Sequence, residues 1–148
     1  MSLKEILQQD WKDALKAKNK FKANTISMAK AAILQAEKSG TSVIDDDDII
    51  QILSREVKQR REALEEFEKA NRQDLVDKTK DEIEILLEYL PKQLSKDEIM
   101  EIIRQAAVDE GANSMKDMGR VMSAVVPKTK GRADGKLVSQ LVKEYLNK

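Results

Sequence analysis

Residues 58–91 read KQRREALEEFEKANRQDLVDKTKDEIEILLEYLP and form the centre of the chain. They continue an apolar seam with steps of four and three positions, a spacing typical of a packed helix. The seam runs through Leu53, Val57, Arg60, Leu64 and Phe67. Asn71 interrupts this pattern, and helical spacing then resumes at Leu75 and stops at Pro91, because proline cannot continue a helix. The stretch therefore predicts two long antiparallel helices with a short break between them.

Arg60 and Arg61 stand in this seam within the segment KQRRE, which places several cations on two helical turns. One interpretation is that their aliphatic stems cover apolar surface while their guanidinium groups pair with nearby carboxylates. The carboxylates in range are Glu56, Glu62, Glu65 and Asp81. The other interpretation is a ligand site, and the acidic surroundings favour the structural one.

Two further helices are predicted before this pair. Ser2 and Glu5 have the spacing of a capping box, in which each side chain satisfies a backbone N–H of the other. The second helix is expected over residues 21–38, and Gly40 is expected to end it with a positive φ. The face predicted to be buried carries Ile26, Ala29, Ile33 and Leu34.

Four consecutive aspartates, residues 45–48, come just before the long central helix. A calcium loop would need alternating ligands, a glycine in the middle and a distal glutamate, none of which follows. Aspartate is also a preferred N-cap, and carboxylates stabilise the positive end of a helix dipole. We therefore interpret the run as a helix cap.

Three short helices are predicted beyond Pro91. A capping box of Ser95 and Glu98 opens a helix that ends at Gly111. The next is expected to start at the Ser114-x-x-Asp117 segment and to stop at Pro127, with a methionine-rich stripe that packs into the core. The last carries Leu137, Val138, Leu141, Val142 and Tyr145 at helical spacing.

The chain is therefore predicted to be all-α, with two domains. A multi-helical domain of long antiparallel helices would span residues 1–91, and a three-helix tail domain would span residues 92–148. The composition agrees, because 41% of the 148 residues are apolar and 36% are charged, while only 3% are aromatic. Abundant Lys, Glu, Leu and Ala with little Gly and Pro is typical of helices.

Cysteine and histidine are both absent. This excludes disulfides, thiol nucleophiles, Cys/His metal sites and histidine-based triads. We predict no catalytic residue, no metal site and no cofactor. The sequence shows no secretion signal and no long apolar run, so we expect a soluble, cytoplasmic protein without a membrane partner.

The net charge of zero hides a partition of charge along the chain. Residues 1–40 carry 8 basic and 4 acidic side chains, residues 41–90 carry 8 and 15, and residues 91–148 carry 11 and 8. An acidic middle therefore lies between two mildly basic ends. A basic end can meet a polyanion, although an excess of three charges is a weak signal.

Residues 126–136 read VPKTKGRADGK and concentrate basic side chains beside a proline and two glycines. A nucleotide-binding P-loop would need four residues between the glycines and a hydroxyl residue after the lysine, so that interpretation fails. Asp134 is instead expected to cap the last helix, with Gly131 in the preceding turn. This turn does not require the cations Lys128, Lys130, Arg132 and Lys136. Phosphate binding by them is the functional alternative.

Two stretches of the chain closely resemble the YqeY family. They are residues 58–94 and residues 117–146, and the second reads DMGRVMSAVVPKTKGRADGKLVSQLVKEYL. The part from Pro91 onward is also similar to the C-terminal tail of the B subunit of glutamine-dependent aminoacyl-tRNA amidotransferases. A similar module occurs in some bacterial glutaminyl-tRNA synthetases. The resemblance implies a helical N-terminal domain followed by a three-helix tail that faces tRNA.

Carried over to this sequence, the resemblance implies a tRNA-binding set of Lys128, Lys130, Arg132, Lys136, Arg120 and Lys143. The leading hypothesis is a non-catalytic tRNA-binding or tRNA-enzyme accessory module. One alternative is a carbon–nitrogen ligase that takes its amido nitrogen from glutamine and acts with partner subunits, as in tRNA amidotransferases. The chain has neither the ATP-using core nor the Ser-Ser-Lys amidase of those enzymes. Another alternative is a protein–protein adaptor that binds a partner through the N-terminal helices.

Overall fold

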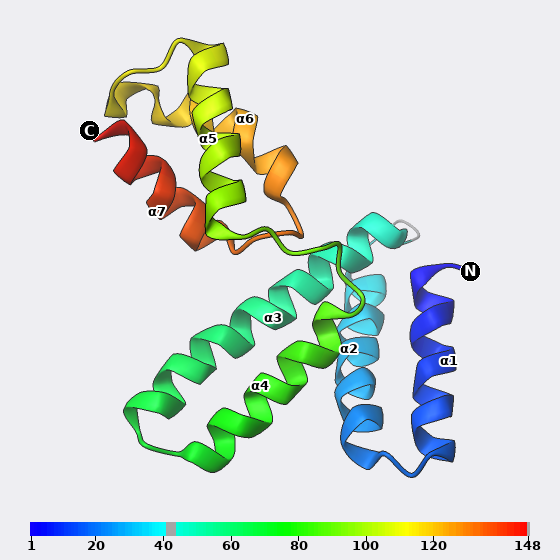
Figure 1. Ribbon diagram of the computed structural model, residues 1–148. Coiled ribbons are helices and arrows are strands. Elements are labelled where there is room, and N and C mark those ends of the chain that lie inside the picture. Colours follow the sequence, from blue (N-terminus) through cyan, green and yellow to red (C-terminus); the bar gives the residue numbers. More distant parts are fainter. Residues whose placement is uncertain (41–43, 148) are drawn as a thin grey trace. The chain divides into compact units, whose positions relative to one another are not determined.

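The computed structural model describes residues 1–40 and 44–147 and is all-helical over those residues (Figure 1). It contains seven α-helices and one short 3₁₀ turn in the described part. The predicted all-α class is therefore confirmed. Within the same residues, none of the helices combines the length and the apolar run needed to cross a lipid bilayer.

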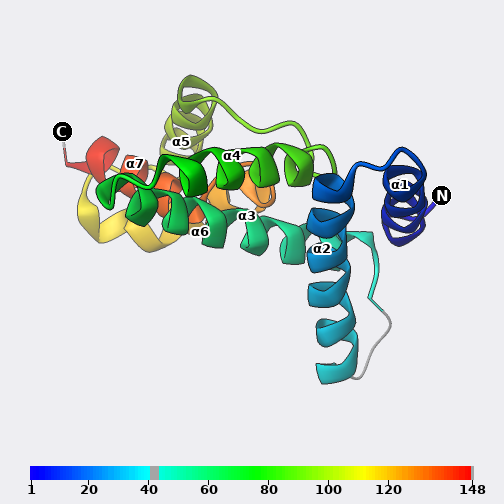
Figure 2. The ribbon, with the colours of Figure 1, turned by 90° about the horizontal axis from the view of Figure 1, so that it is seen from below.

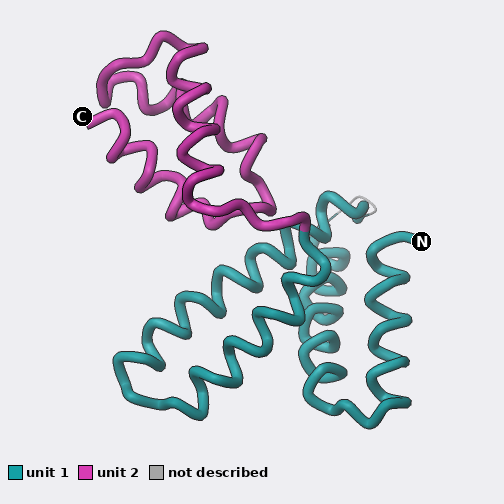
Figure 3. Tube along the Cα trace, in the orientation of Figure 1, with its two compact units in different colours: residues 1–90 teal, residues 91–148 magenta. Residues whose placement is uncertain are grey.

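The chain divides into two compact units, residues 1–90 and residues 91–148, which are coloured separately in Figure 3. Each unit has its own cluster of buried apolar side chains. That each unit is a domain in its own right stays a prediction, and the two units are described one at a time below.

Unit 1 contains α1 (Leu3–Lys16), α2 (Lys20–Ser39), α3 (Asp46–Lys69) and α4 (Gln73–Leu87). The long helices α3 and α4 pack against each other, and the turn between them contains Asn71 in a left-handed conformation with φ of 56°. Asparagine tolerates this conformation better than most residues, which explains the break in the seam. Figure 2 shows α2 crossing the α3–α4 pair near one end.

The aspartate run acts as a helix cap, as predicted. The side chain of Asp45 accepts a hydrogen bond from the backbone N–H of Asp48 at 2.9 Å. The side chain of Asp48 in turn accepts one from the backbone N–H of Asp45 at 3.2 Å. Asp46 accepts from the backbone N–H of Leu3 at 3.0 Å, which joins the starts of α1 and α3. These acidic side chains therefore hold helix ends in place.

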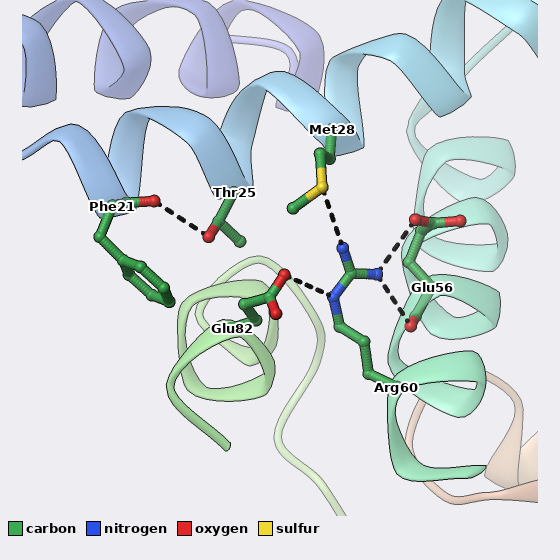
Figure 4. Close-up of polar contacts among 6 residues, drawn as sticks. All are labelled: Phe21, Thr25, Met28, Glu56, Arg60 and Glu82. Carbon is green, nitrogen blue, oxygen red and sulfur yellow. Dashed lines mark hydrogen bonds and ion pairs between the residues drawn. The ribbon is translucent and has the colours of Figure 1, made fainter. Parts of the chain in front are cut away.

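Arg60 lies at the junction of α2, α3 and α4, as Figure 4 shows. Its guanidinium lies 3.4 Å from a carboxylate oxygen of Glu82 and 3.1 Å from one of Glu56, and it also reaches the sulfur of Met28 at 3.8 Å. Its side chain is 14% exposed and that of Glu82 is 11% exposed. The structural interpretation of Arg60 is confirmed for Glu56, but the second partner, Glu82, was not among the predicted carboxylates.

Two expectations for α2 are wrong. Gly40 caps the helix, but its φ is −103° and its backbone is extended, so it does not adopt the expected left-handed conformation. Leu34 was expected on the buried face together with Ile33, yet it is 51% exposed while Ile33 is 2% exposed. Adjacent helical positions lie about 100° apart, so a narrow contact buries only one of them.

Unit 2 contains α5 (Lys96–Glu110), a 3₁₀ turn η1 (Met115–Asp117), α6 (Met118–Thr129) and α7 (Gly135–Leu146). The capping box of Ser95 and Glu98 is present in both directions, and Gly111 ends α5 with φ of 62°. The core between the three helices is built from Ile99, Ile103, Ala106, Ala107, Val121, Val125, Val138, Leu141, Val142 and Leu146.

Both predicted boundaries of α6 need correction. Pro127 lies inside α6, and the helix continues to Thr129 although proline has no N–H to donate to the carbonyl one turn earlier. The turn beyond it is held by the N–H of Lys130, which donates to the carbonyl of Val126 at 2.9 Å. At the other end, Ser114 makes no capping bond with its side chain, and a 3₁₀ turn precedes the helix.

Candidate functional site

The segment 126–136 forms a compact turn between α6 and α7. The backbone N–H groups of Arg132 and Ala133 both donate to the carbonyl of Thr129, at 2.8 and 3.0 Å. Gly131 has φ of 75°, which costs glycine little. Asp134 caps α7 by accepting from the backbone N–H of Lys136 at 3.1 Å. The predicted turn with its cap is confirmed.

The residues that precede α5 are tied to this turn, although they lie about 40 positions earlier in the chain. The backbone N–H of Leu94 donates to the carbonyl of Arg132 at 2.8 Å. The side-chain amide of Gln93 donates to the carbonyl of Gly131 at 2.9 Å. The guanidinium of Arg132 lies 3.5 Å from the carbonyl of Lys92. We refer to residues 92–98 and 128–136 together as the basic end of unit 2.

The basic end contains the whole charge excess of unit 2. Its two segments carry six basic and three acidic residues, whereas the rest of residues 91–148 carries five of each. The basic residues are Lys92, Lys96, Lys128, Lys130, Arg132 and Lys136. Fold and sequence thus collect the positive charge at one end of a small helical unit.

The lysines of the turn are available to a ligand. Lys128, Lys130 and Lys136 are exposed, and none of them pairs with a carboxylate among residues 1–40 and 44–147. Two of the three acidic residues of the basic end are engaged as helix caps, Asp134 on α7 and Glu98 on α5, and the third, Asp97, lies in the first turn of α5. The local carboxylates therefore do not neutralise these three lysines through ion pairs.

The pKa of Glu98 is lowered mainly by its helix cap and to a smaller extent by the cations at this end. Hydrogen bonds from the backbone and then the side chain of Ser95 hold the pKa of Glu98 below its usual range, and the charges of Lys92 and Arg132 lower it further. Two cations from different segments thus act on the same carboxylate. The field that stabilises the ionised Glu98 would also favour an external anion.

Two helices begin at the basic end, α5 and α7. A helix start presents backbone N–H groups and a partial positive charge. In the described part of the chain, the N–H groups of Gly135 and Leu137 donate to no protein atom. The start of α7 therefore adds free donors to the lysines around it.

A pocket of about 180 Å³ lies beside the turn, between the end of α6 and the start of α7. It is lined by Met122, Val126, Thr129, Lys130, Gly131, Ala133, Gly135 and Val138. A larger groove of about 700 Å³ lies in unit 1, between α1 and α2. Its lining carries Lys4 and Lys30 against Glu5 and Glu37, so it has no excess of positive charge.

Arg120 and Lys143 lie away from the basic end. Arg120 is eight residues before Lys128 on α6, or about 12 Å along the helix axis. Its guanidinium pairs with Asp117 and donates to the carbonyl of Glu110 at 3.1 Å. Lys143 is in the last turn of α7, far from the start of that helix. Their contact with tRNA stays a prediction, and so does that of the four residues in the turn.

Sequence reasoning missed Lys92 and Lys96. The predicted order of helices could have identified them. When three successive helices run antiparallel, the start of the first helix lies at the same end as the turn between the second and the third. Both lysines immediately flank the predicted start of α5. Applying this topology to the sequence would have added them to the candidate site.

These features define an all-helical protein whose small three-helix unit presents a cluster of basic residues at one end. The family model described as Yqey-like protein matches residues 4–146. The chain belongs to this family, and the resemblance noted from the sequence is confirmed.

Three relatives extend the comparison. A protein of Pyrenophora tritici-repentis named "Altered inheritance of mitochondria protein 41, mitochondrial" is 34% identical over 95% of this chain and 78% of its own length. An uncharacterized protein of Schizosaccharomyces pombe is 32% identical over 64% of this chain and 76% of its own length. A Lachancea thermotolerans protein with the same name as the first is 34% identical over 57% of this chain and 46% of its own length.

The names of these relatives contradict the expected cytoplasmic location. Two of the three are named as mitochondrial proteins. The expectation rested on the lack of a secretion signal and of a long apolar run, which does not distinguish the cytosol from the interior of an organelle. We therefore withdraw the cytoplasmic assignment.

Proposed function

We propose that this protein is a non-catalytic tRNA-binding or tRNA-enzyme accessory module whose basic end contacts the phosphate backbone of tRNA. The observation that supports the proposal most directly is the concentration of the charge excess of unit 2 at that end. The resemblance of this unit to the tail of an amidotransferase subunit supports tRNA as the polyanion.

The chemistry of the basic end fits a backbone contact better than the recognition of a base sequence. Lysine side chains are flexible point charges, which suit phosphate oxygens and carry no sequence information. Free N–H groups at the start of α7 are further donors for phosphate. Such contacts release counterions, so the affinity depends steeply on salt.

The size of the salt effect follows from the number of cations. We assume that each of the four basic residues of the turn neutralises one phosphate, and that each contact on paired RNA contributes about −0.9 to the slope, as on duplex DNA. The plot of log affinity against log salt then has a slope of about −3.6. Between about 50 and 200 mM salt the affinity should then fall by about a hundredfold. This is a moderate dependence, as expected for a small patch.

The test is tRNA binding by fluorescence anisotropy across a salt series. The double variant Lys128→Gln/Lys130→Gln should reduce the magnitude of the slope by about 1.8, because two phosphate contacts are lost. A matched control is Lys12→Gln/Lys116→Gln, which removes the same charge from exposed lysines outside the basic end. This control should leave the slope close to that of the natural protein.

Three outcomes would contradict the proposal. The first is no binding of tRNA at low salt, and the second is equal slopes for the two double variants. The third is glutamine- and ATP-dependent amidation of a misacylated tRNA by the purified chain, which would replace a binding module with an enzyme.

A further inference from the structure

We propose that the pocket beside the basic end binds one unpaired nucleobase, so that the site prefers RNA with an extrahelical nucleotide to fully paired RNA. This inference rests on the proposed function and specifies the form of RNA that is recognised. The pocket is the space bounded by Met122, Val126, Thr129, Lys130, Gly131, Ala133, Gly135 and Val138.

The lining of the pocket suits a flat, weakly polar group. Three of its side chains are apolar and larger than alanine, namely Met122, Val126 and Val138. The hydroxyl of Thr129 is already bonded to the carbonyl of Val125 at 3.2 Å, so it offers little to a charged ligand. Methionine sulfur makes favourable contacts with aromatic rings. A nucleobase can therefore replace water against this surface.

The size of the pocket also limits its occupant. Pockets for drug-sized ligands are typically about 300 to 1,000 Å³, and this one is about 180 Å³. A whole nucleotide or a folded peptide segment is therefore larger than the space. A single base inserted from outside, with its sugar and phosphate left at the rim, matches it better.

The cations of the turn lie where that phosphate would be. Lys130 lines the pocket itself, and Lys128 and Arg132 are its near neighbours in the same turn. A phosphate held by these side chains brings its own base to the mouth of the pocket. A base that is stacked and paired within a helix cannot enter, whereas bases of loops and bulges can be splayed out.

The test compares two RNA hairpins that have the same number of phosphates. One carries a single bulged nucleotide, and the other carries an abasic residue at the same position. The natural protein should bind the bulged hairpin about tenfold more tightly, which is the lower end of the discrimination that a small apolar pocket provides. Because the phosphates are equal, the difference measures the base alone.

Two variants locate the effect. Val126→Ser and Met122→Gln should each remove most of the tenfold gain, since each makes the pocket lining more polar. Val126 is 44% exposed, so its replacement does not disturb the core. Val108→Ser is the matched control, because Val108 is 61% exposed on α5 and does not line the pocket, and it should retain the gain.

The outcomes separate this inference from the proposed function. The pocket inference would be overturned if the two hairpins bound equally well. The proposed function would still stand if Lys128→Gln/Lys130→Gln reduced the salt slope in the same experiments. Absence of binding to either hairpin and to tRNA at low salt would overturn both. Binding of a free nucleoside monophosphate as tight as that of the bulged hairpin would also overturn the inference, because the ligand would then be a nucleotide and not RNA.

Discussion

Replacing Arg60 with methionine should destabilise unit 1 by about 3 kcal/mol, because it leaves a buried carboxylate without its cation. The side chain of Glu82 is 11% exposed, and Arg60, 3.4 Å away, is its ion-pair partner in the described residues. Removing one member of a buried pair typically costs about 3–5 kcal/mol. We place the cost at the lower end because the contact is long. The other partner, Glu56, is 19% exposed and can turn toward water.

The double variant Arg60→Met/Glu82→Met should recover most of the loss. Replacing both members of a buried ion pair with apolar side chains is often neutral, so we expect a stability within about 1 kcal/mol of the natural protein. The coupling energy between the two positions should then be about 2 kcal/mol or more. The pair would thus contribute little net stability, while either charge left alone would be costly.

Urea unfolding followed by tryptophan fluorescence measures these values. Trp11 is the sole tryptophan of the chain and packs against the core of unit 1, with the ammonium of Lys30 4.2 Å from its ring centre. The control is Arg72→Met, whose guanidinium pairs with Asp74 in solvent, and it should change stability by less than about 1 kcal/mol. A loss below about 1 kcal/mol for Arg60→Met, or a double variant as unstable as the sum of the single ones, would refute the reasoning.

Two further predictions concern hydrogen-bonded titratable groups. Tyr89 donates to Asp10 at 2.6 Å, and burial, followed by this bond, raises the pKa of Tyr89. Tyr89→Phe should cost about 1.5 kcal/mol at neutral pH and should remove part of the loss of stability that the natural protein shows above about pH 10; an unchanged alkaline profile would contradict this. The pKa of Glu98 is lowered, first by the backbone and side-chain bonds with Ser95. Its stabilising contribution should therefore be present above about pH 4.3 and be lost as the pH falls through the lower folded value. Urea unfolding between about pH 6 and 3, followed by circular dichroism so that the helices of unit 2 are included, should show a shallower acid loss for Glu98→Gln than for the natural protein, and identical profiles would count against the cap.

Several helix caps could be predicted from the sequence because both partners of each cap are close neighbours in the chain, although Ser114 does not cap with its side chain and the Ser2–Glu5 box forms only the bond from the N–H of Glu5 to Ser2. The boxes at Asp45 and Ser95 and the left-handed end at Gly111 depend only on residues within one turn. Gly40 and Pro127 were misjudged because each can adopt more than one backbone conformation, and Gly40 is extended while Pro127 is helical. The residue type limits which backbone conformations are accessible, and the surrounding structure determines which of these conformations the residue adopts.

The candidate site could be predicted only in part for the same reason. The four cations of the turn are adjacent in sequence, so a single motif revealed them. Lys92 joins them through hydrogen bonds between segments about 40 residues apart. The pairing of Arg60 with Glu82, 22 residues away, likewise depends on how α3 meets α4. The residues within a motif could be identified from the sequence alone. The residues that lie next to the motif in space could be identified only from the folded structure.

The chain enters unit 2 at the basic end and leaves it at the far end of α7, and this decides where the protein can be modified. The 12 residues of α7 place the end of that helix about 18 Å from its start. A fluorophore attached at residue 147 would therefore remain clear of the lysine cluster. Immobilisation for binding measurements should accordingly use the C-terminus.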